Sequence, residues 1–246
     1  MIVVVLPAYN EAEALPPLLR RIDDAAATLP QPCRVIVVDD GSTDQTAAIA
    51  EEWRGTPVPV TVVRHGKNRG LHAAIDTGLR AAMSVCGSDD WVVTLDADDT
   101  HPPRLIREMV ALGATEGAEL VIASRFQRGA VWHGRTPDRV LFSYGVSWMF
   151  RIVWPMRGVR DYTCGFRAYR GSLLQRARER WGDELVSERS FACMPDLLWK
   201  LHLLRPVIRE VPLELHYDRK PGVSKMQVAR TIRRTLVLLV KRRLGW

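Results

Sequence analysis

The chain has 246 residues, 47% of them apolar, which suits one large α/β domain or two small ones with a sizeable buried core. Its formal net charge of +7 favours anionic partners such as nucleotide diphosphates, lipid phosphates, acidic membrane surfaces or nucleic acid, without choosing among them. Four widely spaced cysteines without zinc-site spacing predict reduced thiols in a cytosolic protein. With no secretion signal and no apolar run of ~20 residues, we expect a soluble or peripheral protein.

The first half of the chain alternates short apolar runs with helical stretches, which is the pattern of parallel βαβ units. We expect strands at residues 2–6, 34–38, 58–63, 91–95 and 120–123. Helical spacing or Ala-rich composition predicts helices at residues 11–29, 46–53 and 71–83, and a further helix is expected to start near Pro102. The pattern predicts an open, mostly parallel sheet flanked by helices, with ligands beyond the carboxyl ends of the strands.

The regular alternation stops after about residue 125, where a basic segment rich in aromatic residues begins. A helix is predicted at residues 191–204 and a strand at 207–216. The aromatic residues of the basic segment together suggest an apolar face near the site, although each taken singly fits ordinary core packing better: Trp132, Trp148, Phe150 and Trp154.

An apolar run at residues 92–95 ends in Asp96, Asp98 and Asp99, ahead of the proline-started helix. Crowded carboxylates repel one another, and a bound cation is the simplest compensation. Oxygen-only ligands favour Mg²⁺ or Mn²⁺. A solvated turn with a helix N-cap is the alternative for such a cluster taken by itself.

Two polar loops follow the first two predicted strands, at residues 7–11 and 39–44. Neither has the glycine pattern of a dinucleotide-binding turn or of a P-loop. Glu11 and Asp39 offer acceptors for ribose hydroxyls and base N–H groups, and Tyr9 offers a ring for stacking. Residues 40–44 fit a turn with a helix cap equally well.

Read together, four motifs resemble those of the family 2 inverting glycosyltransferases of the GT-A fold: PAYNE, VVDDGSTDQT, KNRG and LDADDTHPP. Three later stretches are similar to motifs of the polyprenyl-phosphate sugar synthases of the dolichol-phosphate mannose synthase type: ASRF, DYTCGFRAY and EVPLELHYDRKPGVSK. The resemblance covers nearly the whole chain. It implies transfer of a mannose- or glucose-type sugar from a GDP- or UDP-linked donor to a polyprenyl phosphate, with inversion and with Mg²⁺ or Mn²⁺.

The resemblance also implies roles for individual residues. Asp96 and Asp98 would hold the metal and the donor diphosphate, and Arg219 and Lys225 would act with them as catalytic residues. The rest of the donor- and phosphate-binding set would be Pro7, Tyr9, Glu11, Asp39, Asp40, Arg125 and Arg139, of which Arg139 is the loosest match. Thr100 and Asp196 depart from the subgroup pattern, which often has Gln and Glu there, and this bears on donor specificity.

The expected organisation is a catalytic domain at residues 1–225 and a basic, amphipathic C-terminal helix at 226–246. That helix fits an anionic membrane interface, which predicts peripheral attachment to the cytoplasmic face of the membrane, or it packs on the domain with a solvated basic face. A membrane-embedded partner subunit is a further possibility. No recognised nucleic-acid-binding module is present.

Three other functions compete with this interpretation. A family 2 enzyme acting on another acceptor would share the same motifs. Residues 96–100 also fit the DxDx[TV] nucleophile motif of haloacid-dehalogenase-type phosphatases, but that motif usually sits on the first strand, and three predicted βα units precede it here. A non-catalytic nucleotide-binding membrane protein need not have kept Asp96 and Asp98, so their presence argues against that function.

Overall fold

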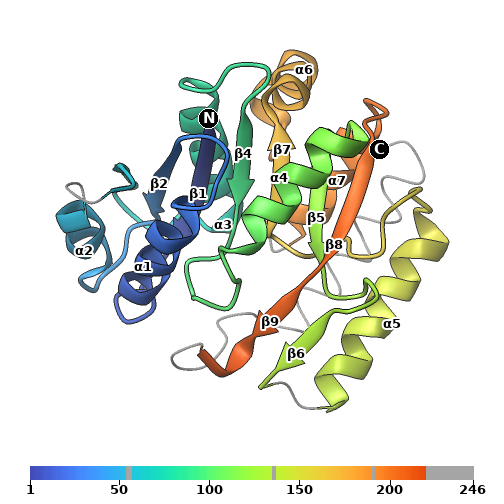
Figure 1. The fold of residues 1–246 in the computed structure, drawn as a ribbon, viewed down its shortest axis with the longest axis horizontal. Helices are drawn as coiled ribbons and strands as arrows, with labels where there is room; N and C mark the ends of the chain where they lie inside the picture. The colour runs from blue at the N-terminus through green and yellow to red at the C-terminus, as the bar shows by residue number, and fades with distance from the viewer. Residues whose placement is uncertain (54–56, 135–136, 190–191, 220–246) are drawn as a thin grey trace.

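The structure, a computed structural model, describes residues 1–53, 57–134, 137–189 and 192–219. A seven-stranded sheet in the order β3-β2-β1-β4-β7-β5-β8 forms its centre (Figure 1). The strands of this sheet are β1 (Ile2–Ala8), β2 (Cys33–Asp39), β3 (Val60–Arg64), β4 (Trp91–Thr94), β5 (Leu120–Ser124), β7 (Arg167–Arg170) and β8 (Ile208–Pro212). Only β7 runs against its neighbours, β4 and β5, so the predicted α/β class with a mostly parallel sheet is confirmed.

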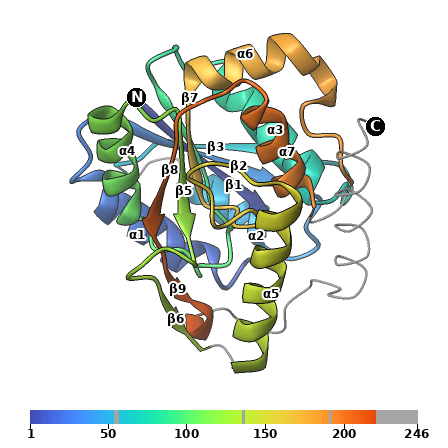
Figure 2. The same ribbon diagram turned by 90° about the vertical axis from the view of Figure 1, so that its right-hand side faces the viewer.

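Helices cover both faces of the sheet, as the side view in Figure 2 shows. On one face lie α1 (Leu15–Ala26) and α4 (Leu105–Glu116). On the other face α3 (Leu71–Met83), α6 (Gly171–Trp181) and α7 (Cys193–His202) contact one another. The short α2 (Thr46–Glu52) packs beside the edge strand β3. This three-layer arrangement buries the central strands from both sides.

The sequence of β1 explains its place in the middle of the sheet. Its residues Val3, Val4 and Val5 have no exposed surface, although they point alternately to the two faces. Continuous β-branched runs of this kind are typical of parallel strands that are covered on both sides. In α1, by contrast, the buried residues recur at helical spacing: Leu15, Leu18, Leu19 and Ile22.

A second, two-stranded sheet lies below the main one, where β6 (Val131–His133) pairs in parallel with β9 (Glu214–His216). The prediction of one continuous strand at residues 207–216 was therefore wrong. Leu213 separates β8 from β9: its N–H donates to the Ser124 carbonyl at 2.9 Å, and its own carbonyl accepts from the Val131 N–H at 3.1 Å. At Leu213 the chain thus stops pairing with β5 and starts pairing with β6.

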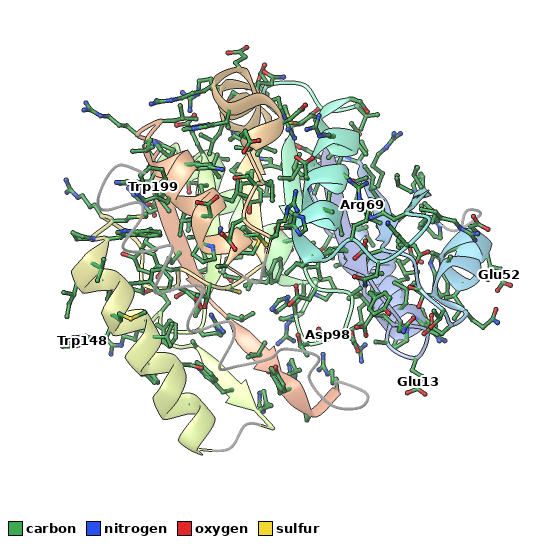
Figure 3. The ribbon with its side chains drawn as sticks, turned by 180° about the vertical axis from the view of Figure 1, so that it is seen from behind. Glu13, Glu52, Arg69, Asp98, Trp148 and Trp199 are labelled. Carbon is green, nitrogen blue, oxygen red and sulfur yellow. The ribbon has the colours of Figure 1, made fainter. Side chains whose placement is uncertain are left out.

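The basic aromatic segment folds largely as α5 (Pro137–Val153), a helix that the sequence interpretation did not predict. Phe150 and Trp154, one turn apart, are buried, with 0% and 5% of their surface exposed. Trp148 lies on the other side of the helix and is 66% exposed, and Figure 3 shows it on the outer side of α5. The four aromatic residues therefore do not share one face.

All four cysteines are free thiols. Among the described residues, no helix combines the length and the apolar character needed to cross a membrane. The predicted C-terminal helix at residues 226–246, and the boundary at residue 225, lie outside the described residues.

Candidate active site

The carboxyl ends of three parallel strands meet at one edge of the main sheet. Ala8 pairs with Asp39, and Val5 pairs with Thr94, so the loops after β1, β2 and β4 begin side by side. Because β7 is antiparallel to both β4 and β5, the carboxyl end of β5, just before Arg125, faces the same edge. In parallel α/β sheets ligands bind at such an edge. The predicted convergence of polar loops is confirmed.

The loops after β1 and β2 are tied together by hydrogen bonds between residues more than 30 positions apart. The Asn10 N–H donates to Ser42 Oγ at 3.0 Å, and Asn10 Oδ1 accepts from the Thr43 N–H at 2.8 Å. The Glu11 N–H donates to Thr46 Oγ1 at 2.8 Å. These bonds hold Asn10 with a left-handed φ of 52°. They fix the backbone beside Tyr9 and Glu11, both half-buried and both predicted to hold the nucleoside.

Asp39, at the end of β2, is buried and accepts the Ser42 N–H at 3.2 Å through Oδ1. The described residues provide no partner for its Oδ2. A carboxylate oxygen in that position is an acceptor for a ligand hydroxyl or N–H group. The placement is compatible with the predicted contact to a nucleoside, as is that of half-buried Pro7 within β1.

Asp40 differs from Asp39, because protein donors engage both of its carboxylate oxygens. Oδ1 accepts from the Arg69 N–H at 2.9 Å and lies 2.6 Å from His65 Nδ1, while Oδ2 accepts from the Gly70 N–H at 2.8 Å. The side chain is almost fully buried. These contacts make Asp40 a positioning residue for the loop at residues 67–70, where Figure 3 labels Arg69. The prediction that it binds the donor directly is not supported by this geometry.

Gly41 brings the same two loops into close contact. Its φ is 70°, and a Cβ at this position would lie 2.4 Å from the carbonyl carbon of Lys67 and 2.6 Å from the nitrogen of Asn68. A left-handed conformation and a contact this short both require glycine. The DDG and KNRG stretches of the sequence therefore form one packed unit.

The acidic loop follows β4 and presents Asp96 and Asp98. Asp98, labelled in Figure 3, is 7% exposed, and its Oδ1 accepts from the Thr100 hydroxyl at 2.7 Å and from the Thr100 N–H at 3.2 Å. The Asp96 N–H donates to His101 Nδ1 at 3.3 Å. A Cβ on Gly165 would lie 3.2 Å from Asp96 Oδ1, so glycine keeps the space beside this carboxylate open.

Asp96 and Asp98 offer oxygen donors only, in a mostly buried loop, and such donors fit Mg²⁺ or Mn²⁺. The residues present therefore suit the divalent cation that the motif implies.

Asp99 has a different environment from the other two carboxylates. Its φ is 60°, its Oδ2 forms an ion pair with Arg21, and its Oδ1 is buried without a hydrogen-bond partner among the described residues. Burial raises the pKa of Asp99 above its ordinary value, and the nearby charges of Arg21 and Arg219 only partly oppose this. Asp99 thus forms an ion pair with Arg21 and is not part of the candidate cation site at Asp96 and Asp98.

Arg219 lies in the short 3₁₀ helix at Tyr217–Arg219, directly after β9. Its charge acts on the pKa of Asp99 in the acidic loop. The His216 N–H donates to the Thr100 carbonyl at 2.9 Å and ties β9 to that loop. Phosphate binding by Arg219 stays a prediction. Arg139 lies in α5 with its side chain outside the described part of the chain, and Lys225 lies outside the described residues altogether.

Arg125 is placed at the predicted edge, but its guanidinium is engaged by a buried carboxylate. Nε and Nη2 donate to the two oxygens of Asp161, each at 2.7 Å. The negative charges of Asp161 and, more weakly, Asp96 outweigh burial and raise the pKa of Arg125. The Arg125 side chain is 15% exposed, so a phosphate would have to bind the part of the guanidinium that Asp161 does not engage. This phosphate contact stays a prediction.

Aromatic rings surround Arg125 on the side of α5. Its guanidinium carbon lies 5.5 Å from the ring centre of Phe126 and 6.0 Å from that of Trp132. Phe126 and Tyr144 contact edge to face with ring centres 5.0 Å apart. These rings place apolar surface beside Arg125. Of the four aromatic residues named from the sequence, only Trp132 contributes to it.

Two residues that organise this site were missed at the sequence level. Asp161 anchors Arg125, and Glu210 Oε1 accepts the N–H groups of Arg160 and Asp161 at 2.6 and 2.7 Å. Their partners are between 36 and 50 positions away along the chain, so no local pattern signals these pairs. Asp196, where the sequence departs from the subgroup pattern, forms a buried ion pair with Lys200 at 3.1 Å within α7.

Comparison with known proteins adds the family context. The model of the family described as glycosyl transferase family 2 matches residues 3–177. The chain is 34% identical over 229 residues to the polyprenol monophosphomannose synthase of Mycolicibacterium smegmatis, covering 91% of this chain and 80% of that one. It is 35% identical over 173 residues to the dolichol-phosphate mannosyltransferase of Pyrococcus furiosus, covering 70% of this chain but only 47% of that one.

Solved structures show the same fold at lower identity. The glucosyl-3-phosphoglycerate synthase of Mycobacterium tuberculosis, in complex with Mn²⁺, UDP and phosphoglyceric acid, aligns with a TM-score of 0.67 and 22% identity. That alignment covers all of this chain and 78% of the other. TarS 1–349 of S. aureus aligns with a TM-score of 0.61 and 21% identity, covering 86% and 59% of the two chains. The GT-A fold class is thereby confirmed.

Proposed function

The chain belongs to glycosyl transferase family 2, and we propose that it transfers a mannose- or glucose-type sugar from a GDP- or UDP-linked donor to a polyprenyl phosphate. The observation that carries the proposal is the meeting of three groups at one sheet edge: the nucleoside loops, the Asp96 and Asp98 pair, and Arg219. Relatives named for polyprenyl-phosphate acceptors support the choice of acceptor.

The donor would bind with its nucleoside between the loops after β1 and β2. Tyr9 would stack on the base, and Glu11 and Asp39 would accept hydrogen bonds from the base or the ribose. Asp96 and Asp98 would hold a divalent cation, which when bound stabilises the charge of the leaving diphosphate. Two solved structures of glucosyl-3-phosphoglycerate synthase, both in complex with Mn²⁺ and UDP, support the binding of a divalent cation and a nucleotide at this edge of the fold.

The proposed reaction is a single displacement. An oxygen of the lipid phosphate forms a bond to the anomeric carbon from one side, while the bond from that carbon to the diphosphate oxygen breaks on the other, which inverts the configuration. A phosphate is already ionised at neutral pH, so the acceptor needs no general base. Arg219 and Lys225 would stabilise the phosphate charges, and Asp40 would act by holding the loop at residues 67–70 in place.

A lipid-borne acceptor requires the site to approach a membrane surface. The outer face of α5 carries three exposed apolar side chains one turn apart, Tyr144, Trp148 and Ile152, which are 51%, 66% and 56% exposed. Near its C-terminal end, Arg151 in the last turn of the helix and Arg157 line an open hollow of about 420 Å³. An exposed apolar stripe flanked by arginines suits the interface of an anionic bilayer. We propose that this face lies on the cytoplasmic membrane leaflet, together with the basic segment at residues 226–246.

The experiment is an assay of the full chain with vesicles containing polyprenyl phosphate, Mg²⁺ or Mn²⁺, and a panel of GDP- and UDP-sugars, with nucleotide release and lipid-linked sugar both measured. We expect sugar transfer with one donor of the panel. Asp98→Asn should lower the rate by about 10³-fold or more, because it removes charge from the proposed cation site. Asp89→Asn, an exposed carboxylate outside the site, is the matched control and should leave the rate unchanged.

Full activity in Asp98→Asn would contradict the cation role of this residue. Transfer to a soluble glycan with none to the lipid would contradict the acceptor. Release of inorganic phosphate from simple phosphomonoesters without sugar transfer would favour the phosphatase alternative instead.

A further inference from the structure

Three side chains of the small sheet converge on one point beside the acidic loop. His133 and His216 are directly paired across β6 and β9, and Glu214 precedes His216 by two residues, so all three side chains stand on the same face of the sheet. Their nitrogen and oxygen atoms lie within 4.8 Å of one another. His133 lies outside the motifs quoted above, and the resemblance assigns no role to Glu214 or His216, which stand within the EVPLELHYDRKPGVSK stretch.

Two of the distances within the cluster match the spacing of ligand atoms around a metal ion. Nε2 of His133 and Nε2 of His216 both lie 3.3 Å from Oε1 of Glu214. This is longer than usual for an N–H···O hydrogen bond, which spans about 2.7–3.2 Å. In a tetrahedral zinc site with bonds of about 2.0–2.1 Å, neighbouring ligand atoms are about 3.3 Å apart.

We propose that His133, Glu214 and His216 bind a zinc ion. Two imidazoles and one carboxylate form a ligand set that zinc uses with water in its fourth position. Imidazole nitrogen favours zinc over Mg²⁺ and Mn²⁺, so this site differs in chemistry from the all-oxygen pair Asp96 and Asp98. The proposal is independent of the sugar-transfer function.

Neighbouring groups orient the three ligands. Arg104 forms an ion pair with Oε2 of Glu214, which leaves Oε1 to the two imidazoles. The two rings are nearly parallel, 7° apart, with centres separated by 4.7 Å. His216 Nδ1 lies 3.7 Å from Oδ1 of Asp218, a carboxylate placed behind the ligand as in many metal sites.

A zinc ion here would stabilise the edge of the sheet that carries the candidate active site. The His216 N–H donates to the Thr100 carbonyl at 2.9 Å, and the Thr100 hydroxyl donates to Asp98. Fixing β9 against β6 would thus limit the movement of the loop that carries Asp96 and Asp98. The expected consequence is a higher thermal midpoint of unfolding when zinc is present.

The test uses the full chain, stripped of metal by a chelator and free of nucleotide and lipid, titrated with Zn²⁺ against a chromophoric chelator. The Asp98→Asn background removes charge from the other cation site, and zinc binding should persist in it. Co²⁺ added in place of Zn²⁺ should give the visible absorption of a four-coordinate ion. In the same background, His133→Ala and Glu214→Gln should each weaken zinc binding about tenfold or more and abolish that absorption.

His202→Ala, which changes a histidine of α7, is the matched control and should bind zinc as tightly as the unaltered protein. The thermal midpoint of each variant without metal shows that it is folded, and only variants that keep the three ligands should gain stability with zinc. Zinc binding of equal affinity in His133→Ala and Glu214→Gln, or no zinc binding by the unaltered chain, would overturn the proposal.

Discussion

Asp40, Asp98 and Asp161 are buried carboxylates close to one sheet edge, and their partners give them different roles. Backbone N–H groups and His65 engage both oxygens of Asp40, Arg125 neutralises Asp161, and Thr100 donates two hydrogen bonds to Oδ1 of Asp98. A buried carboxylate whose two oxygens both bind protein donors is held in place by them. At the scale of single residues, the hydrogen-bond partners therefore identify Asp40 and Asp161 as positioning residues.

The Arg125 and Asp161 pair allows a test of stability. Asp161→Asn should lower the free energy of unfolding at neutral pH by about 3–5 kcal/mol, because it leaves the mostly buried guanidinium of Arg125 without its counter-charge. Urea unfolding of the two proteins measures this difference. Asp183→Asn, which removes an exposed partner of Arg80, is the matched control and should change stability little.

The same pair predicts a pH dependence. Burial alone would raise the pKa of Asp161, but the charge of Arg125 and hydrogen bonds outweigh it and lower the pKa below the ordinary value of 3.8. A carboxyl group with a lowered pKa in the folded state stabilises the protein fully above its unfolded pKa and loses that contribution as the pH falls. The difference between the two proteins should therefore be constant near neutral pH and shrink below about pH 3.8. A difference that grows on acidification would contradict the pairing.

At the scale of elements, the loops after β1, β2 and β3 behave as one unit. Cross-links from Asn10 and Glu11 join the first two loops, and Asp40 with Gly41 joins the third. Because the nucleoside is proposed to bind on these loops, their packing decides where Tyr9 and Asp39 stand. A disturbance in the packing should affect both stability and donor binding.

Gly41→Ala tests that packing. It should cost about 1–3 kcal/mol of stability, because the new Cβ would meet the Lys67 backbone at 2.4 Å. The KM for the sugar donor should rise as the loops shift. Gly66→Ala, where a Cβ meets nothing within 4 Å, is the matched control and should leave both quantities nearly unchanged. Equal effects of the two substitutions on unfolding and donor KM would contradict the packing argument.

At the scale of the whole molecule, the catalytic edge and the outer face of α5 lie on the same half of the protein, around the small sheet (Figure 1). Phe126 and Tyr144 connect the two, since their rings are in contact beside Arg125. A membrane that contacts α5 would thus hold a lipid phosphate near the acidic loop. This arrangement links the proposed acceptor to the proposed surface.

Vesicle binding tests the arrangement. Trp148→Glu and Ile152→Glu should each weaken binding of the full chain to anionic vesicles about tenfold or more, because burying a large apolar side chain stabilises by about 1.5–3 kcal/mol. Leu203→Glu, an exposed apolar residue at the end of α7, is the matched control and should bind as before. Unchanged sedimentation of all three variants with vesicles would contradict docking through α5.

The basic C-terminal segment needs its own test. A chain that ends before Arg230 should stay folded but bind anionic vesicles less tightly, because it loses all the positively charged side chains of residues 226–246. A shortened chain that is folded and binds as tightly as the full one would show that α5 is sufficient.

Local sequence pattern was sufficient for the alternating strands and helices of the first half, because β-branched runs and helical spacing are properties of neighbouring residues. It also identified the loops at residues 7–11, 39–44 and 96–100, since the order of strands in a parallel sheet brings their carboxyl ends to one edge. The prediction that Asp96 and Asp98 form the reaction centre rests on this local sequence pattern.

Other features were decided by contacts between distant parts of the chain. The antiparallel insertion of β7, the break at Leu213, the Arg125 pair with Asp161 and the cluster of His133, Glu214 and His216 all join residues separated by 36 to more than 80 positions. Helix α5 was missed because its apolar residues occupy two opposite sides, one buried in the core and one exposed. Periodicity describes which residues share a face of one element, but only the packed molecule determines what that face meets.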